Sequence, residues 1–312
     1  SSDGSEPFLD VRLDRAEDYS DILPTREEGI KAWLTIQRGC DKFCTFCIVP
    51  FVRGREKSIS LDSLVLETRE LARRGVREIT LLGQTVNSYR DGGHDFADLL
   101  NAVAEVDGIE RVRFTSPHPS DATDAMIRAM GGNPKVCAHM HLPLQSGSDA
   151  MLGRMRRTYT VDEYMRVVDG LRAHVQGVAI TTDIIAGFCG ETPADHEATC
   201  ELMRQVRFDS AFMFKYSPRE GTAAYKKFED DVADEEKISR LKEIIELQEG
   251  ISREVYAGRV GDVVSVLVEG PSKRDPSDFY GKTDDFKTCV FPALSARRGD
   301  IVKVRVASAT AH

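Results

Sequence analysis

The sequence predicts an α/β fold of six strand–helix units followed by a small all-β domain. Six short segments in which apolar and polar residues alternate each precede a longer segment with helical spacing. After Gly258 the helical spacing disappears, and short β-rich segments separated by Gly, Pro, Ser and Asp follow. A length of 312 residues is what about two domains require.

The elements of the first domain follow from this alternation. Strands are expected at residues 30–37, 76–82, 111–115, 138–144, 178–185 and 210–216. Helices are expected at residues 61–74, 96–106, 121–130, 161–174, 194–206 and 234–256. Ser60 and Thr160 are N-cap candidates because their hydroxyls can accept hydrogen bonds from free backbone N–H groups, and Gly75 can end the first helix.

Repeated strand–helix units imply a mainly parallel sheet with right-handed connections. Six units can form an open doubly wound sheet or an incomplete barrel, and the periodicity leaves both possible. The second domain has short strands expected at residues 263–268, 278–282, 286–291 and 301–306, which indicates a small antiparallel barrel. The expected boundaries are therefore an acidic linker over 1–29, the strand–helix domain over 30–257 and the β domain over 258–312.

Charge and composition exclude several classes of protein. The net charge is −9, with three basic and nine acidic residues in 1–29 and ten basic and nine acidic residues in 249–312. A nucleic-acid surface must therefore be a local patch. No apolar run approaches the ~18 residues of a membrane span, so no membrane partner is expected. Seven cysteines without a secretion signal indicate a reducing, cytoplasmic location.

Three of the cysteines lie within eight residues, in the loop that leaves the first strand. Cys40, Cys44 and Cys47 have the spacing C-x3-C-x2-C, and three thiolates on one loop can hold three corners of a cubane iron–sulfur cluster. The fourth iron would be open to another ligand. A structural zinc site is the alternative, but zinc needs four ligands, and the nearest histidine is His94.

Glycine and polar residues follow each of the later strands, at 83–87, 116–118, 145–147, 187–191 and 217–219. Ligand sites in such folds lie at the carboxyl ends of the strands. One catalytic face is therefore expected there, which favours the partial barrel. Gly83 and Gly187 are positions where a missing side chain allows a ligand to approach the backbone; an ordinary turn is the alternative.

The motifs together resemble a known family. RGCDKFCTFCIVPFVRGRE (38–56), TLLGQTVNSY (80–89), HLPLQSGSD (141–149), TDIIAGFCGET (182–192) and FKYSPREGT (214–222) are similar to the radical S-adenosylmethionine (SAM) methylthiotransferases, most of all to those acting on isopentenyl-adenosine in tRNA. The resemblance implies a partial (β/α)6 TIM-like barrel and a TRAM domain, an OB-like all-β barrel. It also implies that Cys40, Cys44 and Cys47 hold a 4Fe–4S cluster whose open iron chelates SAM.

The resemblance further assigns a set of residues near SAM. They are Gly83, Gln84, Asn87, Gln145, Ser146, Asp183 and Gly187. Family members carry a second cluster in an N-terminal domain. No cysteine precedes Cys40, so we expect this chain to be a fragment that binds one cluster and does not methylthiolate unaided.

RNA contacts are expected at two groups of basic residues. Arg53 and Arg55 follow the cysteine loop, whereas Lys273, Arg274 and Lys282 flank turns of the β domain beside aromatic residues. Basic side chains interleaved with aromatics suit backbone contact and base stacking. A role of the β domain in stability or docking is the alternative.

The resemblance implies the addition of a methylthio group to C2 of isopentenyl-adenosine next to the tRNA anticodon. One SAM would methylate sulfur, and a second would be cleaved by one electron to a radical that activates the C2–H bond. An electron donor such as flavodoxin or ferredoxin is expected. Alternatives are a threonylcarbamoyl-adenosine substrate, a ribosomal-protein aspartate, or, from another class, a zinc-stabilised RNA-binding module without catalysis.

Overall fold

The structure is a computed structural model that describes residues 29–293 and 295–310. The predicted acidic linker therefore lies outside the described residues, apart from Gly29. Within the described ranges, no helix combines the length and apolar character needed to cross a bilayer.

Six parallel strands form the first domain. One sheet has the order β1 (Lys31–Thr35), β4 (Glu78–Leu82), β5 (Arg111–Phe114), and a second has the order β6 (His139–His141), β7 (Ala179–Ala186), β8 (Ser210–Lys215). Backbone bonds from Val112 N to Lys135 O (2.8 Å) and from Cys137 N to Val112 O (2.9 Å) join the two. The spatial order follows the chain without the reversal of a doubly wound sheet. The predicted partial barrel is confirmed.

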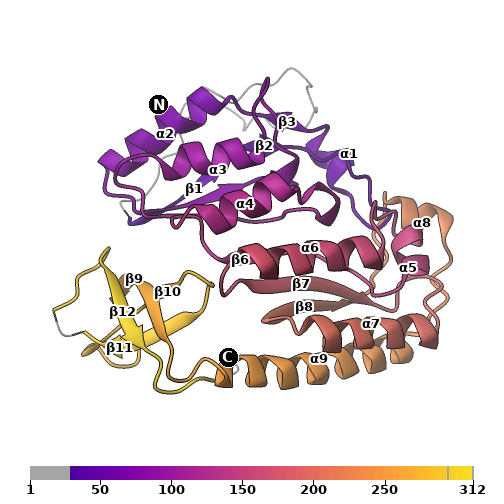
Figure 1. Ribbon diagram of the computed structural model, residues 1–312. Coiled ribbons are helices and arrows are strands. Elements are labelled where there is room, and N and C mark those ends of the chain that lie inside the picture. Colours follow the sequence, from indigo (N-terminus) through magenta and orange to yellow (C-terminus); the bar gives the residue numbers. More distant parts are fainter. Residues whose placement is uncertain (1–28, 294, 311–312) are drawn as a thin grey trace, which may run out of the picture.

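Helices follow the strands and cover their outer face (Figure 1). The long ones are α2 (Leu61–Arg73), α3 (Phe96–Ala104), α4 (Asp124–Gly132), α6 (Val161–His174), α7 (Pro193–Val206) and α9 (Asp234–Ala257). One apolar core between helices and strands includes Leu34, Leu64 and Ile184. Both predicted caps are confirmed, because Ser60 accepts a hydrogen bond from Ser63 N and Thr160 accepts one from Glu163 N.

Several predicted bounds differ from the structure by a few residues, and two of these differences have a clear local cause. α4 begins at Asp124 because Thr123 caps it, and Pro119–Asp121 form a separate 3-10 turn, η2. β6 is only three residues long; Pro143, which lacks an N–H group, lies just beyond it.

The structure adds short elements that the periodicity did not predict. They are β2 (Gln37–Arg38), β3 (Lys57–Ser58), α1 (Val49–Arg53), α5 (Asp149–Arg154), α8 (Ala223–Lys227) and η1 (Val86–Ser88). All of them belong to loops between the main strands and helices, and two to six residues are too few to show a period.

The β domain is a four-stranded antiparallel sheet in the order β11 (Thr288–Pro292), β10 (Asp278–Thr283), β9 (Val263–Pro271), β12 (Ile301–Arg305). Val264, Val266, Val268 and Phe291 form its core. β11 starts later than predicted because Phe286 lies in the turn with a left-handed φ of 67°.

The β domain docks at the amino ends of the barrel strands (Figure 1). Arg111 Nη1 donates to Lys282 O at 2.6 Å, and Arg113 Nη2 donates to Thr283 O at 2.6 Å. Lys287 Nζ pairs with Asp209, just before β8, at 2.6 Å. The β10–β11 hairpin therefore lies at the edge of the barrel opposite to the cysteine loop.

Candidate functional site

The cysteine loop is fixed by the hairpin of β2 and β3. Gly39 has a φ of 75°, and a Cβ there would lie 2.0 Å from Arg55 O, so only glycine fits. Cys40 N donates to Gly54 O at 3.1 Å, and Cys47 N donates to Cys44 O at 3.0 Å. The three thiols therefore lie on a held loop just beyond β1.

Two side chains from other loops contact the sulfur atoms. Thr85 Oγ1 lies 3.4 Å from Cys40 Sγ, and Arg157 Nη1 donates to Cys44 Sγ at 3.2 Å. Burial raises the pKa of Cys40 and Cys47, and the neighbouring thiols raise both further. Holding all three as thiolates in this buried place therefore requires a positive group between them, such as a metal cluster.

The three sulfur atoms of the cysteine loop are not gathered as closely as the ligands of a single ion. A tetrahedral zinc ion with bonds of about 2.3 Å brings its sulfur ligands to within about 4 Å of one another. Among the described residues, the group of three whose ligand atoms all lie within 4.8 Å is His196, Cys200 and Glu243, and the cysteine triplet is not such a group. A multi-iron cluster holds its cysteines further apart.

Two buried polar atoms near this loop have no hydrogen-bond partner among the described residues: Gln37 Oε1 and His118 Nε2. Gln37 Oε1 faces Gly83, where a Cβ would lie 3.3 Å from it. Buried polar atoms are almost always satisfied, so these two fit a site completed by another group. An amino group such as that of SAM can donate to Gln37 Oε1. Sequence reasoning missed Gln37 because it reads as an ordinary strand position.

Asn87 positions a loop with both atoms of its amide. Its Nδ2 donates to His118 O at 2.9 Å, and its Oδ1 accepts from His118 N at 2.7 Å. The residue therefore holds the loop after β5, whereas the exposed Gln84 three residues earlier has its side chain available.

The loop after β6 pairs with strand β7. Gln145 N donates to Asp183 O at 2.8 Å with a left-handed φ of 69° at Gln145. Ser146 is fully buried, and its hydroxyl lies 3.4 Å from Thr199 Oγ1 of α7. Asp183 Oδ1 lies 3.3 Å from His141 Nε2. Gln145 and Asp183 thus share one edge, while Ser146 turns toward a helix.

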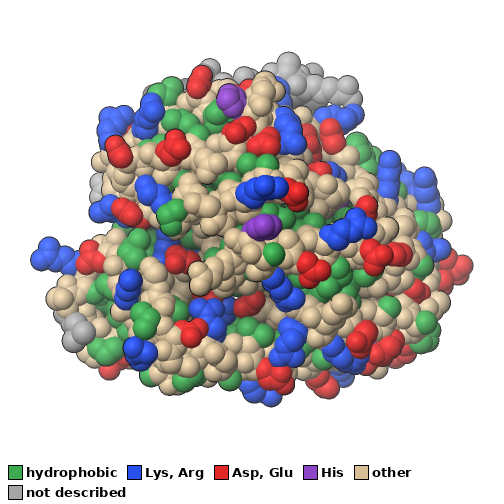
Figure 2. Space-filling view, in the orientation of Figure 1, with side chains coloured by type: hydrophobic (Ala, Val, Ile, Leu, Met, Phe, Trp, Pro, Cys, Tyr) green, Lys and Arg blue, Asp and Glu red, His purple; other side chains and the backbone are tan. Residues whose placement is uncertain are grey.

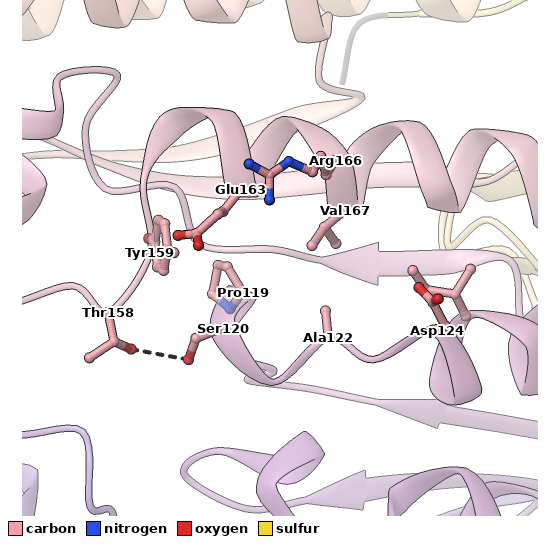
Figure 3. Close-up of a pocket in the computed structure, with 10 residues that line it drawn as sticks. Pro119, Ser120, Ala122, Asp124, Thr158, Tyr159, Glu163, Arg166 and Val167 are labelled. Carbon is pink, nitrogen blue, oxygen red and sulfur yellow. Dashed lines mark hydrogen bonds between the residues drawn. The ribbon is translucent and has the colours of Figure 1, made fainter.

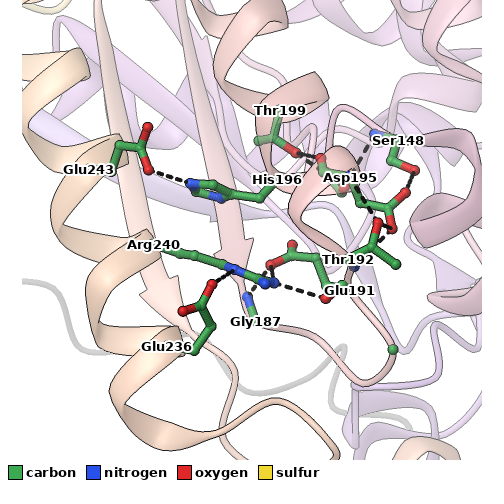
Figure 4. Close-up of polar contacts among 12 residues, drawn as sticks. Ser148, Gly187, Glu191, Thr192, Asp195, His196, Thr199, Glu236, Arg240 and Glu243 are labelled. Carbon is green, nitrogen blue, oxygen red and sulfur yellow. Dashed lines mark hydrogen bonds and ion pairs between the residues drawn. The ribbon is translucent and has the colours of Figure 1, made fainter.

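Gly187 is explained by the packing of α9 (Figure 4). A Cβ at Gly187 would lie 2.3 Å from the side chain of Lys237. Gly187 N donates to Glu191 Oε2 at 2.7 Å, and Arg240 Nη1 pairs with the same carboxylate at 2.8 Å. The glycine therefore lets the loop close against a buried ion pair.

The five basic residues predicted to contact RNA fall into two separate groups. Arg53 and Arg55 are exposed at the cysteine loop, where Arg55 pairs with Asp41. Lys273 and Arg274 are exposed in the turn between β9 and β10. Lys282 is partly buried, with its Nζ 4.7 Å from the centre of the Phe286 ring. On the face shown in Figure 2, basic and acidic side chains are intermingled.

A surface pocket lies between η2 and the start of α6 (Figure 3). Ser120 and Thr158 meet across it at 3.1 Å, and Glu163 and Arg166 line one side. None of the residues predicted for the cluster, SAM or RNA lines this pocket.

Profiles of two families match the chain. The radical SAM superfamily matches residues 34–203, and the TRAM domain matches residues 258–312. A tRNA-2-methylthio-N(6)-dimethylallyladenosine synthase of Chlorobium phaeobacteroides is 47% identical over 94% of this chain and 67% of its own length. The enzyme of that name from Prosthecochloris aestuarii is 48% identical over 98% of this chain and 69% of its own.

Solved structures are similar in fold. The radical SAM methyltransferase TsrM of Kitasatospora setae has a TM-score of 0.54 at 17% identity, covering 63% of this chain and 39% of its own. Coproporphyrinogen III oxidase of Escherichia coli has a TM-score of 0.54 at 16% identity, covering 72% of this chain and 53% of its own.

Proposed function

The chain belongs to the radical SAM superfamily and, within it, to the tRNA-2-methylthio-N(6)-dimethylallyladenosine synthases; from this premise we propose the reaction that it serves. That reaction adds a methylthio group to C2 of N6-dimethylallyl-adenosine in tRNA, and this chain would supply its radical SAM and TRAM parts. The observation that carries the proposal is the held cysteine loop, with its two sulfur contacts, in a chain 47% identical to such enzymes.

Cys40, Cys44 and Cys47 would hold a 4Fe–4S cluster, and Gln37 with the Gly83 turn would receive SAM. When bound, these groups supply the one-electron chemistry that opens the C2–H bond. Arg157 donates a hydrogen bond to Cys44 Sγ, and the Thr85 hydroxyl lies at hydrogen-bond distance from Cys40 Sγ. Hydrogen bonds to the sulfurs of a cluster set its reduction potential. Asn87 and Gly39 hold the loops on either side in one geometry.

The partners follow from the chemistry. The substrate base must be unstacked to reach a buried site, so we propose the anticodon stem–loop as the bound form of tRNA. A flavodoxin or ferredoxin would supply the electron, and the reaction would take place in the cytoplasm, where tRNA and free thiols coexist. We further propose that the strand–helix domain ends at residue 257 and that Lys273 and Arg274 contribute RNA contacts.

The test separates radical chemistry from zinc binding. The chain is reconstituted anaerobically with iron and sulfide and then given SAM and a strong reductant. We expect about four iron atoms per chain and release of 5′-deoxyadenosine, with both lost in Cys44→Ala. Cys289→Ala, in β11, is the matched control and keeps both. Uptake of one zinc, no iron and intact SAM would refute the proposal.

A further inference from the structure

The concave inner face of the barrel, called the lumen here, is defined by the alternation of the strands. Leu34 of β1 and Ile184 of β7 belong to the core beneath the helices. Successive side chains of a strand point to opposite faces, so the residues next to them face the lumen. These include Trp33 of β1 and Asp183 of β7, and, by the register with β7, Phe212 and Phe214 of β8.

Three large aromatic side chains of this face are open to solvent. Trp33 is 60% exposed, Phe212 is 59% exposed and Phe214 is 55% exposed. They lie on β1 and β8, the first and last strands of the barrel, and so on both sides of its open edge. Strands of a parallel sheet are normally buried on both faces. An apolar lining left open in this position is suited to an apolar ligand.

A polar pair lies beside the aromatic residues. The ring of His141 meets Phe212 edge-on at 5.9 Å, and His141 Nε2 lies 3.3 Å from Asp183 Oδ1. Phe212 is the β8 partner of Asp183 in the sheet register. This wall therefore offers a hydrocarbon surface next to a carboxylate, which disfavours a second negative charge.

The amino end of the lumen is closed by the β10–β11 hairpin. The Phe286 ring stacks on His139 at 5.1 Å with an angle of 24°, and the Arg113 guanidinium lies 5.1 Å from the centre of the same ring. His139 is the first residue of β6. A ligand in the lumen would therefore enter from the cysteine end or through the open edge, which Trp33 borders on one side and Phe212 and Phe214 border on the other.

We propose that Trp33, Phe212 and Phe214 form the subsite for the hydrocarbon group on N6 of the substrate adenine. This rests on the proposed function and goes further, because it assigns the residues that select a dimethylallyl group over a threonylcarbamoyl group. The five-carbon dimethylallyl group is apolar and gains from leaving water. A threonylcarbamoyl group carries a carboxylate, which would lose hydration and face Asp183.

Trp33 is the only tryptophan of the chain, so its fluorescence reports directly on the subsite. The full chain is titrated with three synthetic anticodon stem–loops that differ only at one adenine: unmodified, N6-dimethylallyl and N6-threonylcarbamoyl. We expect the dimethylallyl RNA to bind roughly ten times more tightly than the other two, the scale of discrimination typical of small apolar groups. A blue shift of the Trp33 emission should accompany that binding alone.

Variants separate recognition from folding. Phe212→Ala and Phe214→Ala should each reduce the preference for the dimethylallyl RNA over the other two to about threefold or less. Neither should weaken the binding of the unmodified RNA. Phe212→Leu should retain most of the preference for the dimethylallyl RNA. Leu66→Ala, which removes a 62% exposed side chain from the outer helix α2, is the matched control and keeps the preference. Circular dichroism confirms that each variant is folded.

The outcomes distinguish the two proposals. Equal affinity for all three RNAs, or an equal loss of affinity for all three in Phe212→Ala, would overturn the subsite while leaving tRNA as the partner. Absence of binding to every RNA would overturn the tRNA substrate and the subsite with it.

Discussion

Removal of the Arg113 guanidinium should release the β domain from the barrel. Arg113 is 3% exposed; its Nε donates to Glu78 at 3.0 Å, and its two Nη atoms donate to Asp284 O at 2.9 Å and Thr283 O at 2.6 Å. Arg113→Met keeps the apolar stem but leaves the buried Glu78 carboxylate and two carbonyls without this partner. Breaking one side of a buried ion pair costs about 3–5 kcal/mol.

The expected effect is large enough to read by proteolysis. A loss of about 4 kcal/mol raises the population of the undocked state by up to about three powers of ten, since each 1.4 kcal/mol is a factor of ten. The connection between α9 and β9 should therefore be cleaved far faster under native conditions. The matched control is Arg77→Met, because Arg77 forms only an exposed contact with Glu110 at 3.5 Å, a pair that contributes less than about 1 kcal/mol.

The reasoning would be wrong if Arg113→Met and Arg77→Met were cleaved at rates within threefold of each other. It would also be wrong if the faster cleavage of Arg113→Met disappeared in about 0.5 M salt, because a buried pair is screened much less than an exposed one.

Three further predictions concern other contacts. Gly39→Ala should abolish iron uptake in reconstitution because the added Cβ would lie 2.0 Å from Arg55 O. Gly54 has the same φ of 75°, but a Cβ there would have no neighbour within 4 Å, so Gly54→Ala should retain most of the iron uptake. Glu191→Gln should lower the free energy of unfolding by about 3 kcal/mol in urea titration because Arg240 loses its buried partner. Glu197→Gln, which removes an exposed ion pair, should change it by less than about 1 kcal/mol. Equal effects of the two substitutions would contradict a stabilising role of the buried pair. Burial acts to raise the pKa of Asp285, but Lys287, Thr283 and Arg259 outweigh it and hold the pKa below its usual 3.8. The stability that this lowered pKa contributes is present above pH 3.8 and is lost as the pH falls through the lowered pKa. In Asp285→Asn, the free energy of unfolding should therefore fall less steeply as the solution is acidified. An unchanged dependence on pH below 3.8 would refute the contribution of Asp285.

The fold was largely predictable because its signals are local. The alternation in residues 30–37 and the hydroxyls of Ser60 and Thr160 depend only on neighbours in the sequence, and the structure confirms the first strand and both caps. The short helix α5 and the two-residue strand β3 were not predictable, because tertiary contacts rather than periodicity stabilise segments of that length.

The site was predictable in part. The cysteine spacing is local, whereas the contacts of Arg157 and Thr85 with the sulfurs join residues 113 and 45 positions apart. Asn87 illustrates a different difficulty: its place in the motif suggests SAM, and the motif does not reveal that both atoms of its amide contact the backbone of His118. Sequence shows which polar residues lie near a site and does not show whether they face its ligand or its scaffold.

Because the β domain docks at the amino ends of the strands, the barrel strands separate it from the cysteine loop. β7, the longest barrel strand, has eight residues and thus spans about 26 Å at 3.3 Å per residue. A nucleic acid that touched both the β domain and the cysteine loop would have to reach from the amino ends of the barrel strands to their carboxyl ends. An RNA that makes both of the contacts proposed above must reach both ends of the barrel, so a short single strand with the correct base would contact one end only.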